Sequence, residues 1–313
     1  MTKRQFNKDD AIKVLSERNN WDRWGPDDQM GAMNLITSQV RLEAVKLVRF
    51  GELVSLSRNF PKDPGPGNPF PGQLYVKTKP RGEGGAATDY LGIAYHGLSC
   101  THIDALCHIW DRGKMWNGKD PSEVIKGTGS EWGDINKWGD GLLTRGILLD
   151  IPKFRNVSCV EIDDPVQGWE LEKVCDSVGL TTKPGDAIVI HSGRDAWNRK
   201  HGIPWGSGDL CAVGEFGRQE RPGLHPSCLE FIRDTDCSML IWDMMEMIPD
   251  SLDLDWSIHA AIPSFGIGLV DNAFTEPLSA ACANHNVWEF LVVIAPLRIE
   301  GGTGSPVNPL ALL

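Results

Sequence analysis

The sequence lacks several features that would place it in a specialised class of protein. No apolar run approaches the roughly 18–20 residues of a membrane span, and the first ten residues are polar rather than a secretory apolar core. The 8 cysteines include no C-x-x-C pair, which predicts reduced, mostly buried thiols and no disulfide framework. Internal repeats and low-complexity tracts are absent too. By default, these absences predict a cytoplasmic globular protein.

Positive charge is also in short supply. The chain carries 31 Lys and Arg against 42 Asp and Glu, a formal net charge of -11. An acidic surface repels nucleic acid and anionic lipid, so neither is an expected partner. The length of 313 residues and a hydrophobic content of 41% suffice for a substantial core, and nothing marks a linker. We therefore expect a single domain over residues 1–313.

Three familiar functional signatures are incomplete. Ser192 precedes Gly193 at the end of an apolar run, but no G-x-S-x-G surrounds it. Residues 301–304 are too short for a phosphate loop and no lysine follows them. The acidic stretch 243–256 lacks the spacing and glycine of a calcium loop, so we expect it to be a solvated loop or a subunit contact.

The hydrophobic pattern predicts a mixture of helices and strands. Helical spacing and capping residues indicate helices at 9–17, 37–49, 170–177 and 227–233. Short apolar or alternating runs indicate strands at 52–57, 144–151, 186–191, 237–242 and 287–295, with 144–151 and 186–191 suited to central strands. Residues 60–87 are rich in Pro and Gly and are expected to form a long exposed loop.

The most informative stretch is 95–110, Y-H-G-L-S-C-T-H-I-D-A-L-C-H-I-W. His102 and Asp104 stand two apart, which on a strand puts both side chains on one face, about 6.6–6.8 Å apart along the backbone. An imidazole and a carboxylate so placed can bind one divalent cation. His108 lies four residues past Asp104 and could face the same cavity without being a ligand. His96 lies six residues before His102, and a bulge between them would draw it closer.

The run T-H-I-D-A-L-C-H resembles the signature of the metal-dependent cyclase superfamily, which includes bacterial kynurenine formamidases and isatin hydrolases. The usual pattern is H-x-G-T-H-x-D-x-P-x-H, and its later positions are matched in register by Thr101, His102, Asp104 and His108. The usual first His falls at Leu98 and the usual Pro at Leu106. Weaker similarities follow in the family's order at 24–34, 114–118, 145–152, 185–193, 222–224 and 301–306.

The resemblance implies a fold, a cofactor and a reaction. The implied fold is α+β, a barrel-like β core flanked by helices, and the family suggests a homo-oligomer. The implied reaction is hydrolysis of an amide, cyclic amide or lactone of a small molecule with a divalent metal ion, Mn²⁺ or Zn²⁺. His102 and Asp104 would bind the metal, and His108 would act as general acid or base.

A second part of the resemblance lies downstream. In dinuclear members of the family, a His and a Glu twelve residues apart bind the second metal, and His259 and Asp271 have this spacing with Asp in place of Glu. One metal or two therefore remain open. We rank His259 ahead of His96 as the third ligand, because His259 needs only the family fold.

Two further alternatives stay open. Trp110 and Trp116 either line an aromatic substrate pocket or pack in the core. The protein is either the hydrolase or a non-catalytic small-molecule or metal-binding protein on the same scaffold. Leu98 and Asp271, the two departures from the family's ligands, favour the binding protein. Metal analysis followed by hydrolysis assays would separate these two functions.

Overall fold

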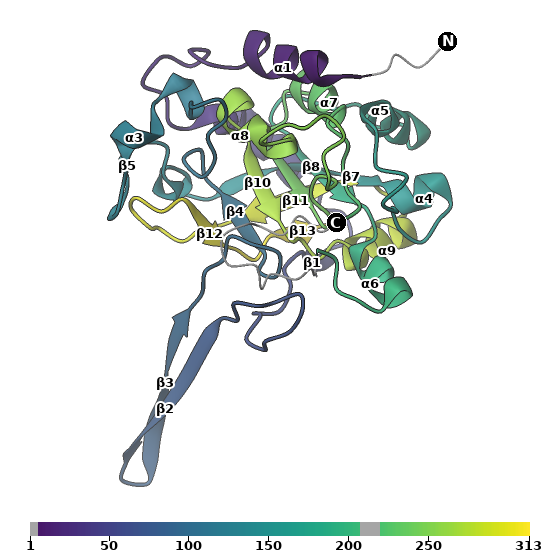
Figure 1. Cartoon of the computed structure of the whole chain (residues 1–313). Coiled ribbons are helices and arrows are strands. Elements are labelled where there is room, and N and C mark those ends of the chain that lie inside the picture. The colour runs from purple at the N-terminus through teal and green to yellow at the C-terminus, as the bar shows by residue number, and fades with distance from the viewer. Residues whose placement is uncertain (1–5, 207–219) are drawn as a thin grey trace.

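The structure, a computed structural model, describes residues 6–206 and 220–313. A curled sheet of nine strands forms a half-barrel, and helices flank it (Figure 1). This architecture confirms the predicted α+β fold with a barrel-like core. Two two-stranded sheets lie outside the main sheet in the described residues.

The main sheet has the strand order β1-β13-β11-β7-β8-β9-β10-β4-β12. Its strands are β1 (Leu53–Ser55), β4 (His102–Asp104), β7 (Leu142–Asp150), β8 (Ala187–His191), β9 (Met239–Trp242), β10 (Gly268–Asp271), β11 (Glu289–Ile294), β12 (Gly304–Pro306) and β13 (Leu310–Leu312). Neighbouring strands from β7 to β10 run parallel, and the outer pairs run antiparallel. The smaller sheets pair β2 (Gln73–Arg81) with β3 (Gly84–Gly92), and β5 (Ile125–Lys126) with β6 (Gly129–Ser130).

Helices connect the parallel strands and cover the sheet. They are α1 (Lys8–Glu17), α2 (Ser38–Val45), α3 (Pro121–Val124), α4 (Ile151–Arg155), α5 (Gly168–Ser177), α6 (Arg194–His201), α7 (Cys228–Asp234), α8 (Ala261–Phe265) and α9 (Glu276–His285). Short 3₁₀ helices are η1 (Gly31–Leu35), η2 (Trp116–Gly118), η3 (Ile135–Trp138) and η4 (Ile258–Ala260). A parallel pair requires such crossovers, because the chain must return to the same edge of the sheet.

The apolar runs of the sequence became the buried strands, as expected. All five residues of β8 are buried, and so are all four of β9, which fits strands covered on both faces. The predicted helices at 9–17, 170–177 and 227–233 are confirmed within one or two residues. The helix predicted at 37–49 begins as expected, where the Thr37 hydroxyl accepts the Val40 N–H, but it ends at Val45.

The expectation of a long loop at 60–87 is wrong for its second half. Residues 73–92 form the antiparallel hairpin β2–β3, joined by a two-residue turn in which Gly82 has a φ of 60°. Pro80 and the paired glycines at 84 and 85 suppressed the strand signal. Both faces of this hairpin are exposed, so the alternation of apolar and polar residues that usually marks a strand is weak.

The cysteines behave as predicted in the described part of the chain. Seven are free and buried, and Cys211 lies outside the described residues. Among the described residues, no helix is long and apolar enough to cross a membrane.

Candidate functional site

The pairing of three strands brings the predicted ligands together. In β4, His102 lies opposite Asp271 of β10, and Asp104 lies opposite Gly304 of β12. Because His102 and Asp104 are two apart on the strand, both side chains point to one face of the sheet. The His102, Asp104 and Asp271 side chains are almost completely buried.

The Asp104 carboxylate is the centre of the cluster, and four histidines converge on it. Its Oδ1 lies 2.9 Å from His96 Nδ1, 3.4 Å from His102 Nε2 and 3.8 Å from His108 Nε2. Its Oδ2 lies 3.8 Å from His259 Nε2. Every residue that the sequence predicted as a metal ligand or catalytic group, Asp271 included, thus lies in this cluster, although the roles themselves stay predictions.

His96 reaches Asp104 although the family's usual histidine position holds Leu98. The segment before β4 is a series of bends rather than a strand, and Gly97 has a φ of 153°, which residues with a side chain rarely adopt. The Tyr95 hydroxyl donates to the Gly304 carbonyl at 2.8 Å and anchors this bend beside β12. His96 Nε2 lies 2.9 Å from the Thr303 hydroxyl, which leaves Nδ1 facing Asp104.

His259 lies in η4 and meets Asp271 across the site. Its Nε2 is 3.3 Å from Asp271 Oδ2, and Trp242 Nε1 donates to the other oxygen of Asp271 at 2.5 Å. The shorter arm of Asp, compared with the Glu of dinuclear relatives, therefore still reaches the cluster.

Sequence reasoning missed Glu246, whose carboxylate contacts Nδ1 of His259, the ring nitrogen that faces away from the cluster. Glu246 Oε2 lies 2.6 Å from His259 Nδ1, and Arg221 Nη2 donates to Glu246 Oε1 at 3.2 Å. The sequence predicts that the acidic stretch 243–256, which includes Glu246, is a solvated loop or a subunit contact. A solvated loop is wrong for the beginning of the stretch, because Asp243 and Glu246 are buried. The signal in the sequence was the position of Glu246, only four residues after the apolar run of β9.

The hydrogen-bond partners fix the protonation pattern of two histidines. His102 Nδ1 lies 2.9 Å from the Cys100 carbonyl, which can only accept, so Nδ1 carries a proton. The Glu246 carboxylate accepts a hydrogen bond from Nδ1 of His259 in the same way, so this Nδ1 also carries a proton. The Nε2 atoms of both rings therefore face the carboxylates of Asp104 and Asp271, and this arrangement requires a proton on Nε2 or a cation between the two groups.

The charges of the cluster depend on one another. Burial disfavours the ionised Asp104 carboxylate, but the nearby imidazoles of His108, His102 and His96 outweigh it and hold the pKa of Asp104 well below its usual value. Burial likewise lowers the pKa of His259, but Glu246 and Asp271 outweigh it and raise that pKa well above the ordinary value. In the absence of a metal ion, protons on the imidazoles thus balance the buried carboxylates.

The residues fit a divalent cation. Both Asp104 oxygens and His96 Nδ1 are buried without a hydrogen-bond partner among the described residues. Two groups of potential ligand atoms lie within 4.8 Å of one another, His96–His102–Asp104 and Asp104–His259–Asp271. Neither group contains a cysteine, and nitrogen and carboxylate ligands suit Mn²⁺ or Zn²⁺. Each group holds one of the two competing third ligands, and Asp104 belongs to both.

His108, like His96, has more access to solvent than His102 and His259. Its side chain is 24% exposed, whereas that of His102 is 1% exposed. It stacks on His96 with ring centroids 3.7 Å apart and ring planes 6° from parallel. Burial lowers the pKa of His108 to about 4, so its imidazole is neutral at pH 7 and able to accept a proton.

The two tryptophans proposed for substrate contact lie in different environments. Trp116 is fully buried and donates its indole N–H to the Asp28 carbonyl at 2.9 Å. Of the two alternatives left open for Trp116, this placement favours core packing over a pocket role. Trp110 is 48% exposed just beyond His108 and remains a candidate for substrate contact.

The difference between these tryptophans predicts different costs of truncation. Replacing Trp116 by Ala should lower the free energy of unfolding by about 3–5 kcal/mol, because a large buried side chain leaves a cavity. Replacing Trp110 by Ala should change it by less than about 1 kcal/mol. Urea denaturation of both variants measures this, and equal costs would refute the assignment of Trp116 to the core.

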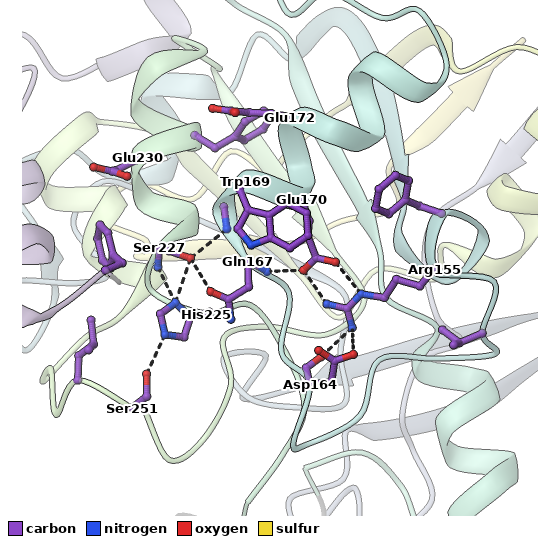
Figure 2. Close-up of a pocket in the computed structure, with 16 residues that line it drawn as sticks. Arg155, Asp164, Gln167, Trp169, Glu170, Glu172, His225, Ser227, Glu230 and Ser251 are labelled. Atoms are coloured by element: carbon purple, nitrogen blue, oxygen red, sulfur yellow. Dashed lines mark hydrogen bonds and ion pairs between the residues drawn. The ribbon is translucent and has the colours of Figure 1, made fainter. Parts of the chain in front are cut away.

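A wide pocket of about 1130 Å³ lies elsewhere, between α4, α5 and α7, and none of the predicted site residues line it (Figure 2). His225 Nδ1 accepts the N–H of Ser227, so its Nε2 carries the proton and donates to the Ser251 hydroxyl. His225 in this state cannot take a proton from Ser251. Arg155 is paired with Glu170. Neither His225 nor Arg155 of the described lining is therefore available as a base, and the His cluster stays the candidate site.

Comparison with known proteins shows which family the chain resembles. The family model described as "Putative cyclase" matches residues 54–247, more than half of the chain. A search of curated proteins finds no match. A crystal structure described as a novel cyclase is 25% identical, with 96% of this chain and 99% of that chain covered and a TM-score of 0.81.

Two isatin hydrolases share the fold at lower identity. One, solved with the product analogue thioisatinate, is 15% identical over 88% of this chain and 99% of that chain, with a TM-score of 0.56. The other, isatin hydrolase A from Ralstonia solanacearum, is 15% identical over 83% and 91% of the two chains, with a TM-score of 0.51. With the family model matching more than half of its length, the chain belongs to the cyclase family.

Proposed function

We propose that the protein is a metal-dependent hydrolase of a small amide, cyclic amide or lactone. The observation that supports this most is the buried Asp104 carboxylate, whose oxygens lie 2.9–3.8 Å from nitrogens of four imidazoles and make no hydrogen bond of normal geometry within the described residues. Isolating a carboxylate from water is costly unless a cation compensates it. The family and the fold of the isatin hydrolases are consistent with hydrolysis.

Each residue has a distinct task in this proposal. His102 and Asp104 hold the metal, and His96, His259 and Asp271 complete one or two metal positions around the shared Asp104. A bound divalent ion supplies Lewis acidity and lowers the pKa of a coordinated water toward neutrality.

His108 is the proton carrier. It is neutral at pH 7, partly exposed, and directly beside the ligand cluster. In the proposed reaction it accepts a proton from the attacking water and delivers it to the leaving nitrogen or oxygen. Trp110 lies two residues further on and offers an exposed aromatic surface to a substrate ring.

The function is tested by metal analysis of the purified protein and assays on N-formylkynurenine, isatin and a simple lactone. Bound metal with turnover on any of them supports the proposal, and the preferred substrate tells amide from lactone. Bound metal without turnover on a broad panel favours the non-catalytic binding protein instead.

Replacing Glu246 by Gln should weaken metal binding about 10- to 100-fold, the usual cost of losing a carboxylate that orients a ligating histidine. The change removes the charge that fixes the Nδ1 proton of His259. Chelator competition measures the affinity, and the exposed Glu172→Gln variant is the matched control. Unchanged affinity in the Glu246 variant would remove His259 or its orientation from the metal site.

A further inference from the structure

One buried amide bridges the bend that carries His96 to the cluster. Asn272 directly follows β10, and it is fully buried. Its Nδ2 donates to the Gly97 carbonyl at 2.7 Å and to the Cys100 carbonyl at 2.9 Å. The two N–H bonds of a single side chain therefore hold both ends of the segment that lies between His96 and His102.

The backbone of Asn272 holds the same part of the chain. Its φ of 56° lies in the left-handed region, which asparagine tolerates better than most residues that have a side chain. The Asn272 carbonyl accepts from the Thr101 hydroxyl at 2.8 Å, and that hydroxyl accepts from the Arg58 backbone N–H at 3.0 Å. Glycine would adopt this backbone equally well, so what glycine could not supply at this position is the amide bridge.

A buried arginine orients the amide. Arg194 Nη1 donates to Asn272 Oδ1 at 2.7 Å, and its Nη2 donates to the Leu98 carbonyl at 2.6 Å. Because a guanidinium can only donate, this contact turns Oδ1 toward Arg194 and leaves Nδ2 facing the bend. Arg194 also lies 4.8 Å from the centroid of the Trp205 ring, and in the described part of the chain it pairs with no carboxylate. Burying a cation without such a pair is costly, so its contacts with the bend must offset that cost.

Both ends of the bridged bend adjoin histidines of the cluster. The Cys100 carbonyl that the amide holds also accepts from His102 Nδ1 at 2.9 Å, and this leaves Nε2 of the ring facing Asp104. At the other end, Gly97 directly follows His96, whose Nδ1 lies 2.9 Å from Asp104 Oδ1. A change in the position of either carbonyl would therefore move a ring nitrogen that faces the carboxylate.

We propose that Asn272 is a positioning residue. Held by Arg194, its amide sets the bend before β4 and aims the rings of His96 and His102 at the centre of the cluster. The bend lets a histidine two residues before the family's usual position, which holds Leu98 here, reach the carboxylate. The use of this positioning for metal binding rests on the proposed function, but the ring geometry itself is measurable in metal-free protein.

The test compares Asn272→Gly with the matched control Asn156→Gly in the full-length chain. Both asparagines have a φ of 56°, which glycine retains. Asn156 is exposed at the end of α4, and its side chain makes no hydrogen bond within the described residues. Any difference between the two variants therefore reports on the amide and not on the backbone conformation.

The first readout is the ¹⁵N NMR spectrum of the imidazoles in chelator-stripped protein, with signals assigned by His96→Gln and His102→Gln. The wild type and the control should give one sharp set of signals, with Nδ1 of His102 protonated. In Asn272→Gly, the signals of both rings should broaden or split, because the bend is no longer bridged. A role limited to stability would lower the unfolding temperature without moving these signals.

The second readout is the affinity for Mn²⁺ and Zn²⁺, measured by chelator competition. Asn272→Gly should bind each ion about tenfold more weakly or worse, the usual cost of losing a group that orients a ligand, and the control should match the wild type. Arg194→Lys should change both readouts in the same direction, because an ammonium lacks the fork that reaches Leu98 and Asn272 together. This second variant decides the matter if Asn272→Gly does not fold.

Wild-type imidazole signals and wild-type metal affinity in the folded variants would overturn the proposal. So would a lower unfolding temperature as the sole effect, since the amide would then only stabilise the fold. A wild-type protein that binds neither ion would refute the proposed function instead, and the imidazole signals of the metal-free variants would still decide whether Asn272 positions the rings.

Discussion

Replacing Asp104 by Asn should remove the metal and the turnover together. The side chain keeps its shape, but it loses the negative charge around which four histidines are arranged. Because Asp104 belongs to both candidate ligand groups, neither metal position survives the change. We expect affinity for the metal to fall by more than about 100-fold, beyond the cost of losing a group that only orients a ligand.

The measurement is metal content per chain by mass spectrometry, together with hydrolysis rate. Asp163→Asn, at an exposed position, is the matched control and should retain both. An Asp104→Asn protein that keeps full metal content would show that the ion is bound elsewhere. A thermal unfolding curve separates metal loss from loss of fold.

Replacing His108 by Ala should leave the metal in place and lower kcat about 100- to 10,000-fold. The imidazole is partly exposed, and its neutral state at pH 7 suits it to accept a proton. Because the fold does not depend on this side chain for a buried hydrogen bond, stability should change little.

The comparison of kcat, KM and metal content identifies the role of His108. Loss of metal would make it a ligand, and unchanged kcat would remove it from the mechanism. A rise in KM alone would assign it to substrate binding. The matched control is His201→Ala. His201 is a partly exposed histidine on α6, and its side chain is paired with Glu161.

The sequence predicted the central strands and the heart of the site for clear physical reasons. The strands β7, β8 and β9 are apolar runs that the fold buries, so hydrophobicity alone predicts that these segments are strands. His102 and Asp104 share a face because the two-residue period of a strand requires it. The pairing of β4 with β10 could not be read from spacing, but the family resemblance pointed to His259 and Asp271.

The features that sequence reasoning left open or missed depend on tertiary contacts. His96 is a candidate ligand from the sequence, but it joins the cluster through bends around Gly97, which strand periodicity cannot express. Glu246 looked like one acid among many in a polar stretch, and only the fold turns it toward His259. The hairpin β2–β3 lacks an apolar face packed on the core, so no alternation signalled it.

The central claim is that hydrolysis requires a metal ion bound at the Asp104 cluster. The most direct measurement is the rate of hydrolysis of the best substrate on the amide and lactone panel, as Mn²⁺ or Zn²⁺ is added back to chelator-stripped protein. We predict a rate near zero without metal that rises in proportion to bound ion and levels off at one or two ions per chain. Full activity in the stripped protein, or no turnover at full metal loading, would contradict it.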